Sequence, residues 1–150
     1  MSVVQVSAEI DAPPQTVWNV VANPHNLPKW DRHIASVRGV PREGLHAGVE
    51  YTTEIRFMGV RAHSTSKIVE FQPPEYSKVE LQGLVEGTVQ TWLEPLDGGS
   101  RTRLRHRVEY RFVGGPFGRL GARAVNVLGA PVLLRRGVQA QKRQAEESAG

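Results

Sequence analysis

The sequence of 150 residues contains no cysteine, which removes disulfides, thiolate nucleophiles and cysteine metal sites from the candidate chemistry. It also lacks any run of about 18 consecutive apolar residues, so it predicts no membrane-spanning helix. Its first residues show no basic segment ahead of an apolar stretch, the pattern of a signal peptide. We therefore expect a cytoplasmic protein with no stable membrane insertion.

Lysine is scarce: the positive charge comes from 15 arginines and 4 lysines, together 19, and the formal net charge is +4. Hydrophobic residues make up 39% and charged residues 23%, as in an ordinary folded protein, and the length predicts one domain over residues 1–150. A basic chain suits an acidic partner such as nucleic acid or anionic lipid. A charge this small, spread over the whole chain, favours a solvated surface, so we expect no nucleic-acid partner.

The order of the segments predicts an α+β fold. Residues 3–10 alternate as a strand, the following prolines open a helix over 14–23, and Asn23-Pro24 ends it. A brief second helix or turn extends to about residue 33. Six further strands follow, with turns every eight to fourteen residues, and this spacing is typical of an antiparallel meander.

The C-terminal part predicts one long amphipathic helix over residues 116–146, because apolar residues recur there at steps of three and four. Gly129 and Pro131 fall in its middle, so we expect a bend. A seven-stranded antiparallel sheet has to bury one face, and only this helix is long enough to cover it. A curved sheet around such a helix leaves a gap, with the two short helices at its mouth.

The segment TRLRHRVEYRF, residues 102–112, alternates between apolar and charged residues as a half-buried strand does. His106 is the exception, because it lies on the apolar parity between Leu104 and Val108. A buried, neutral imidazole suits a general acid or base. The other interpretation is a core histidine whose ring is hydrogen-bonded to a buried group, and the sequence leaves both open.

Three stretches resemble the START/SRPBCC superfamily, also called the Bet v 1-like or helix-grip fold, and most of all its bacterial polyketide cyclase/dehydrase-like branch. They are VVQVSAEIDAPPQTVWNVVANPHNLPKWDRHIASV, then VEFQPPEY, and finally GGSRTRLRHRVEY followed by GGPFGRL. The resemblance implies a seven-stranded antiparallel sheet around one long C-terminal helix, with two short helices after the first strand. It also implies a hydrophobic small-molecule ligand in a central cavity and no cofactor.

The resemblance and the strand parities together predict the residues of the site. His106 is the candidate for moving a proton, and the hydroxyl of Tyr110 is the candidate for holding a developing enolate oxygen. Trp30 is either a flat gate for a planar ligand or a lid on the core. The predicted ligand-binding residues are Trp30, Tyr51, Ile55, Phe57, Val79, Leu81, Val108, Phe112, Leu120, Asn126 and Val127.

Three functions remain open at this point. The first is a cofactor-independent polyketide cyclase, aromatase or dehydratase of biosynthesis, and the second is a non-catalytic lipid or quinone carrier. The third is an interaction module using the arginines at 101, 103, 105, 107 and 111, which share one strand face. His25, His33 and Asp31 do not have the spacing of a metal site. The sequence leaves open a monomer or homodimer and the facing of His63, Glu86 and Trp92.

Overall fold

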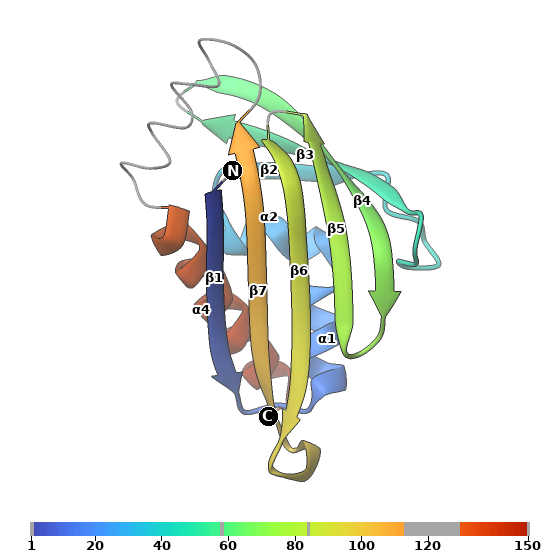
Figure 1. Ribbon diagram of the computed structural model, residues 1–150, viewed down its shortest axis with the longest axis vertical. Helices are drawn as coiled ribbons and strands as arrows, with labels where there is room; N and C mark the ends of the chain where they lie inside the picture. The colour runs from blue at the N-terminus through green and yellow to red at the C-terminus, as the bar shows by residue number, and fades with distance from the viewer. Residues whose placement is uncertain (1, 58, 84, 113–129, 150) are drawn as a thin grey trace.

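Seven antiparallel strands form one curled sheet in the computed structural model, which describes residues 2–57, 59–83, 85–112 and 130–149 (Figure 1). The strand order is β1-β7-β6-β5-β4-β3-β2, so six strands form a meander and the first strand pairs with the last. This confirms the predicted antiparallel meander. The strands are β1 Ser2–Ile10, β2 Ile34–Arg38, β3 Glu50–Phe57, β4 Val60–Gln72, β5 Tyr76–Gly83, β6 Val85–Leu96 and β7 Arg101–Phe112.

The α-helices of the described residues lie on one face of the sheet, which we call the inner face; the opposite face is the outer face (Figure 1). They are α1 Pro14–Val21, α2 Leu27–Trp30 and α4 Ala130–Ala149, with the 3-10 turn η1 Pro24–Asn26 between α1 and α2. Pro14 opens α1, a position where the missing N–H of proline removes no helical hydrogen bond. The two short helices after the first strand are therefore confirmed.

The long C-terminal helix is confirmed in its second half, where α4 covers Ala130–Ala149. Pro131 lies in the first turn of the described helix. Residues 116–129, including Gly129 and the predicted bend, lie outside the described residues. Val138, Gln141 and Ala145 are the buried positions of α4 and recur at steps of three and four, as one helix face requires.

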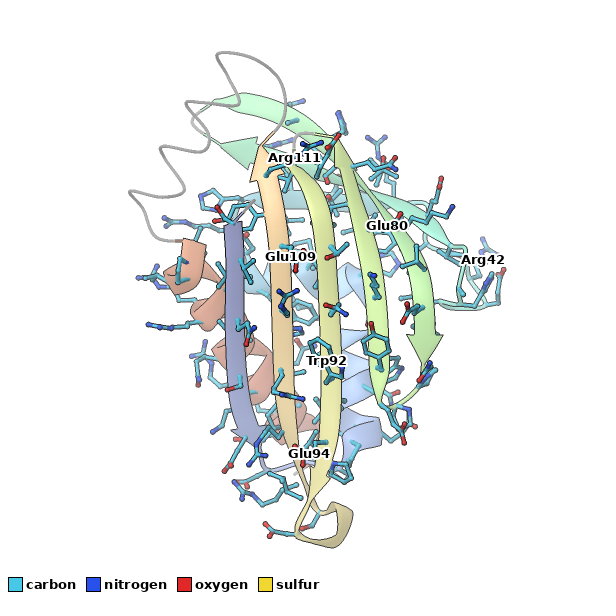
Figure 2. All side chains as sticks on the ribbon, in the orientation of Figure 1. Arg42, Glu80, Trp92, Glu94, Glu109 and Arg111 are labelled. Carbon is cyan, nitrogen blue, oxygen red and sulfur yellow. The ribbon has the colours of Figure 1, made fainter. Side chains whose placement is uncertain are left out.

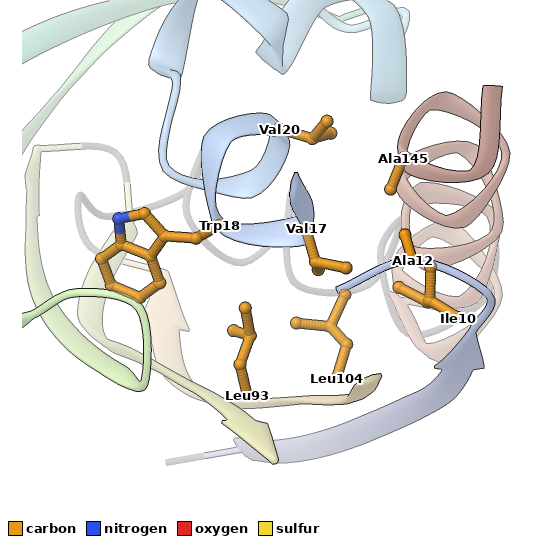
Figure 3. Close-up of a cluster of buried hydrophobic side chains, with 8 residues drawn as sticks. All are labelled: Ile10, Ala12, Val17, Trp18, Val20, Leu93, Leu104 and Ala145. Atoms are coloured by element: carbon orange, nitrogen blue, oxygen red, sulfur yellow. The ribbon is translucent and has the colours of Figure 1, made fainter. Parts of the chain in front are cut away.

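The closed core lies at one end of the inner face, where α1 and α4 pack on the sheet (Figure 3). Val17 of α1, Ala145 of α4 and Leu104 of β7 are each 0% exposed. Trp18 meets Phe71 edge to face, with ring centroids 5.3 Å apart. The cluster consists of Ile10, Ala12, Val17, Trp18, Val20, Leu93, Leu104 and Ala145.

Two local features set the register of the strands. The β6–β7 hairpin turns through the short 3-10 segment η2 Asp97–Gly99, where Gly98 and Gly99 have φ of +71° and +97°. Glycine adopts these angles without the steric cost that other residues incur, so the turn expected from DGGS is confirmed. A bulge between Ile68 and Glu70 adds one residue to β4 relative to β5, which shifts the side-chain parity of β4 at that point.

We predict that Leu104→Ala lowers the free energy of unfolding by about 2–5 kcal/mol, because it opens a cavity in the closed core. Val3→Ala, at a side chain 50% exposed on the neighbouring strand, is the matched control and should change it by no more than about 0.5 kcal/mol. Urea denaturation of both variants measures the difference. Equal losses would contradict this location of the core.

Candidate functional site

The inner face changes character along β6 and β7. At the end covered by α1, Leu104 and Leu93 pair with each other and are 0% and 4% exposed. The next inner-face pair is His106 with Thr91, and beyond it Val108 pairs with Val89, both only half-buried. His106 and Thr91 therefore lie at the boundary between the closed core and a more open apolar surface.

This open surface, which we call the inner wall, consists of half-buried apolar residues on β1, β3, β5, β6 and β7. The register aligns Val108 of β7 with Val89 of β6 and Val79 of β5 in one row across the sheet. The predicted ligand-binding residues Ile55, Val79, Leu81 and Val108 are thus on one face, as the strand parities indicated. The inner wall comprises Val4, Ile55, Val79, Leu81, Val85, Val89 and Val108.

His106 is held by a hydrogen bond at each ring nitrogen. Thr91 Oγ1 lies 2.9 Å from His106 Nδ1, and Gln141 Oε1 of α4 lies 2.9 Å from His106 Nε2. Thr91 and Gln141 are buried, with 7% and 8% exposed. We call these three residues the Thr91–His106–Gln141 chain. It links the middle of the sheet to the helix that covers it.

The partners fix the tautomer of the ring. An amide oxygen only accepts hydrogen bonds, so Nε2 carries the proton and donates it to Gln141. The neutral ring then has its lone pair on Nδ1, which accepts the hydroxyl proton of Thr91. Burial lowers the pKa of His106, and the bond to Gln141 opposes this in part. Thr91 and Gln141 had no signal in the sequence, since threonine and glutamine at such positions are usually solvated.

Tyr110 shares the inner face with His106 but is not beside it. It lies four residues further along β7, about 13 Å at the usual rise of a strand. Its side chain is 8% exposed, and it pairs with Gly87 of β6. A Cβ at Gly87 would overlap the carbonyl oxygen of Glu109, so only glycine allows the two strands to approach here.

Tyr51 brings a second polar group to the inner face, on β3. Burial raises the pKa of its hydroxyl, while a hydrogen bond with the Ser66 side chain acts in the opposite direction. Ser64 and Thr53 lie next to this pair and are each 6% exposed. Their hydroxyls donate to backbone oxygens at 3.3 Å, Ser64 to Gln82 and Thr53 to Ser64. The sequence analysis did not predict these buried hydroxyls, because serine and threonine are common on the exposed faces of strands.

Trp30 lies at the end of α2 and contacts α4. Its indole Nε1 donates to Gln144 Oε1 over 3.1 Å, and its ring packs against the closed core. A role in holding α2 to α4 agrees with the lid interpretation. The role of a gate for a planar ligand stays a prediction.

The residues whose facing was open all lie on the outer face. Trp92 pairs in register with Arg105 and Tyr76, with ring centroids of Trp92 and Tyr76 5.6 Å apart (Figure 2). Glu86 accepts from Arg111. His63 is exposed and pairs with Glu54. The β4 bulge lies between His63 and Phe71, so these residues face opposite sides of the sheet although they have the same parity, and Phe71 packs on the core.

On the outer face, carboxylates form ion pairs with four of the five arginines of β7, those at 101, 103, 107 and 111 (Figure 2). Arg103 contacts Glu94 at 3.1 Å and Glu9 at 3.3 Å. Arg105 lies over Trp92, 5.5 Å from the ring centroid. The remaining pairs are Arg101 with Glu9, Asp11 and Asp97, Arg107 with Glu109, and Arg111 with Glu86. This pairing agrees with a solvated outer face and reduces the charge that an acidic partner would meet.

Other polar groups do not gather into a metal site in the described ranges. His33 Nδ1 lies 2.9 Å from Asp31 Oδ1, while His25 is exposed. Among the described residues, no group of three or more histidine, aspartate or glutamate side chains has a geometry suited to a metal ion. No helix within those residues is long and apolar enough to cross a bilayer.

Two surface hollows of the described residues lie apart from the Thr91–His106–Gln141 chain. One of about 480 Å³ follows β5 to β7 and is lined mainly by polar residues such as Glu80, Thr88 and Glu109. The other, of about 320 Å³, lies between α1 and the turn after β4, where Trp18 and Phe71 contribute to its lining. Four of the predicted ligand-binding residues, Ile55, Val79, Leu81 and Val108, lie on the inner wall, and Leu81 also contributes to the lining of the first hollow.

Five of the predicted site residues have side chains outside the part of the chain that the structure describes. Leu120, Asn126 and Val127 lie outside the described residues, and so do the side chains of Phe57 and Phe112. Their assignment to a ligand site stays a prediction.

A seven-stranded antiparallel sheet curled around a C-terminal helix, with short helices after β1, defines a helix-grip protein. The family model "Polyketide cyclase / dehydrase and lipid transport" matches residues 1–146. The chain belongs to this family, which confirms the resemblance inferred from its sequence.

Known proteins agree with this assignment. The uncharacterized protein Rv1546 of Mycobacterium tuberculosis is 30% identical over 129 residues, 83% of this chain and 89% of that protein. The crystal structure of TTHA0849 from Thermus thermophilus has a TM-score of 0.77 at 16% identity, covering 99% of this chain and 100% of that one. The di-domain ARO/CYC BexL of the BE-7585A biosynthetic pathway has a TM-score of 0.66 at 23% identity, covering 97% of this chain and 47% of that one. At these identities the two structures show the shared fold.

We predict that the lowered pKa of His106 makes the fold less stable as the pH falls. Below about pH 6.5 the unfolded ring takes up a proton while the folded ring does not, so stability declines from there down through the folded pKa. His106→Gln should remove this part of the slope. Urea denaturation between about pH 7.5 and 5.5 measures it, with His63→Gln, at an exposed ring, as the control. Identical slopes in wild type and His106→Gln would contradict the burial of a neutral ring.

Proposed function

We propose that the protein binds a hydrophobic, cyclic or polyketide-like small molecule against the inner wall and acts on it as a cofactor-independent cyclase, aromatase or dehydratase. The observation that carries the proposal is the boundary on β6 and β7, where half-buried apolar residues meet the Thr91–His106–Gln141 chain, in which Thr91 and Gln141 are buried and His106 is half-buried. Small-molecule sites combine a mainly apolar surface with a few oriented polar groups in this way. Membership of the polyketide cyclase, dehydrase and lipid transport family supports it.

The proposed chemistry depends on the shape of the inner wall and on one acid/base group, the imidazole of His106. An apolar wall that folds a flexible polycarbonyl chain brings the reacting atoms together and replaces a costly conformational search. The neutral imidazole of His106 suits the removal of the acidic proton between two carbonyl groups and its return during dehydration. A tyrosine hydroxyl, that of Tyr110 or Tyr51, suits the stabilisation of the enolate oxygen.

A carrier without chemistry, for a lipid or quinone, is the second candidate. The observation in its favour is that both nitrogens of His106 are already hydrogen-bonded, as in a core histidine with a structural role. A carrier needs only the inner wall and an opening to solvent.

Native mass spectrometry of freshly purified protein, followed by extraction of the bound molecule, tests the ligand class. An aromatic or polyketide-like molecule supports the enzyme, and a lipid or quinone supports the carrier. With such a substrate, His106→Gln should reduce turnover by about 10²- to 10⁴-fold with little change in ligand affinity. Unchanged turnover would contradict the catalytic role of His106.

We predict that Val79→Trp, which fills the inner wall, weakens the binding of 2-naphthol about tenfold or more. Lys78→Trp is the matched control, because it places the same side chain on the outer face of the same strand. Naphthol fluorescence gives both affinities. Equal affinities in the two variants would show that the probe does not bind at the inner wall.

A further inference from the structure

The hydrogen bonds of His106 limit how a ligand can use it. Its Nε2 proton is given to Gln141 and its Nδ1 lone pair receives the hydroxyl of Thr91, each over 2.9 Å. A ligand therefore reaches a free position on either nitrogen only by displacing a partner. Both partners are nearly buried, and Gln141 is held within α4.

We infer that the hydroxyl of Thr91, and not the ring of His106, exchanges a proton with the bound ligand, while His106 stores the proton and Gln141 fixes the tautomer. The inference rests on the proposed function, but it replaces direct proton removal by His106 with transfer through Thr91, and it narrows the substrate class to molecules with an acidic hydroxyl, a phenol or an enol. Thr91 is then the catalytic residue at the ligand, and Gln141 is a positioning residue. Thr91 supplies the hydroxyl, His106 is the base that accepts its proton, and Gln141 orients the base, an arrangement that enzymes use to activate a hydroxyl.

The proton transfer balances without a further reactant. The O–H bond of the ligand breaks and its proton joins Thr91 Oγ1, while the hydroxyl proton of Thr91 moves to His106 Nδ1. The products are a ligand anion and an imidazolium ion, and reversal of the same steps returns the proton. The electron pair of the broken O–H bond stays on the ligand oxygen.

The imidazolium form fits the site without movement of its partners. Nδ1–H then donates to Thr91 Oγ1, which is able to accept, and Nε2–H continues to donate to Gln141 Oε1. In the free protein, burial favours the neutral ring, so Nδ1 carries no proton before the ligand binds. The anion that forms on the ligand then offsets the charge of the imidazolium. Three residues are identified around the His106 ring: its hydrogen-bond partners Thr91 and Gln141, and Val6, which pairs with His106 on β1. None of the three carries a charge that would oppose protonation of the ring.

The place of Thr91 suits contact with a ligand on the inner wall. On β6 it lies between Leu93 of the closed core and half-buried Val89 of the inner wall. Ser77 of β5 pairs with it and adds a second hydroxyl to the same inner-face row. One edge of a planar ligand that lies on Val89 and Val79 would thus contact the hydroxyls of Thr91 and Ser77.

The first test uses 4-nitrophenol, whose phenolate is yellow, at a pH below its pKa in water. We expect the bound probe to show the phenolate band in wild type. In Thr91→Val, which keeps the side-chain shape, the ratio of phenolate to phenol should fall about tenfold, one unit of apparent pKa. Thr91→Ser should restore the band, and Thr88→Val, on the outer face of the same strand, should leave it unchanged.

The second test is independent of any ligand. Nitrogen NMR of the histidine rings should find His106 protonated at Nε2 in the wild type and a mixture of tautomers in Gln141→Leu. A wild-type ring protonated at Nδ1 would overturn the relay, by which we mean the proton transfer from the ligand through Thr91 to His106. Such a ring has no lone pair on Nδ1 to accept the proton of Thr91.

The outcomes separate the relay from the proposed function. Binding of 4-nitrophenol with the same phenolate fraction in wild type and Thr91→Val overturns the relay and leaves the ligand site intact. Failure of both 4-nitrophenol and 2-naphthol to bind the wild type overturns the proposed function and the relay with it. Loss of the band in Thr91→Val, with binding retained and rescue by Thr91→Ser, supports the relay.

Discussion

The structure depends on how the inner face of a seven-stranded sheet is covered, and among the described residues α1, α2 and α4 cover only part of it. The α1 and α4 helices close one end of that face over Leu104, where the core excludes water. Beyond His106 the described valines and leucines on the inner face of β5, β6 and β7 are only half-buried, while Tyr110 of β7 is buried. Within the described residues, the half-buried valines and leucines beyond His106 form the inner wall, which is the surface proposed for the ligand.

The Thr91–His106–Gln141 chain lies where these two regions meet and connects sheet to helix. A polar group buried without partners costs free energy, so the chain is tolerated because each member satisfies the next. Trp30 and Gln144 make a second such link, between α2 and the same face of α4. The polar groups of the inner face thus hold the helices in place, and in the proposed function they also contact the ligand.

Much of the fold followed from the sequence, because most strands alternate between apolar and polar residues and the turns between them contain glycine or proline. The parity of β7 placed Leu104, His106 and Val108 on the inner face correctly, and the proline pair located α1. A bulge in β4 hid the facing of His63, because parity arguments fail when one residue is added to a strand. The partners of His106 were not predicted. Thr91 faces it across the β6–β7 hairpin, 15 residues away, in a register that strand parity does not specify, and Gln141 comes from α4, 35 residues away.

The central claim is that the inner wall receives a hydrophobic ligand, and methyl NMR during titration with 2-naphthol tests it most directly. The account predicts that methyl signals of Val79, Val89 and Val108 shift together in a saturable manner. Those of Val3 and Val132, which are 50% and 44% exposed, should stay in place. Shifts confined to Val3 and Val132, or an absence of saturation at the inner wall, would contradict it.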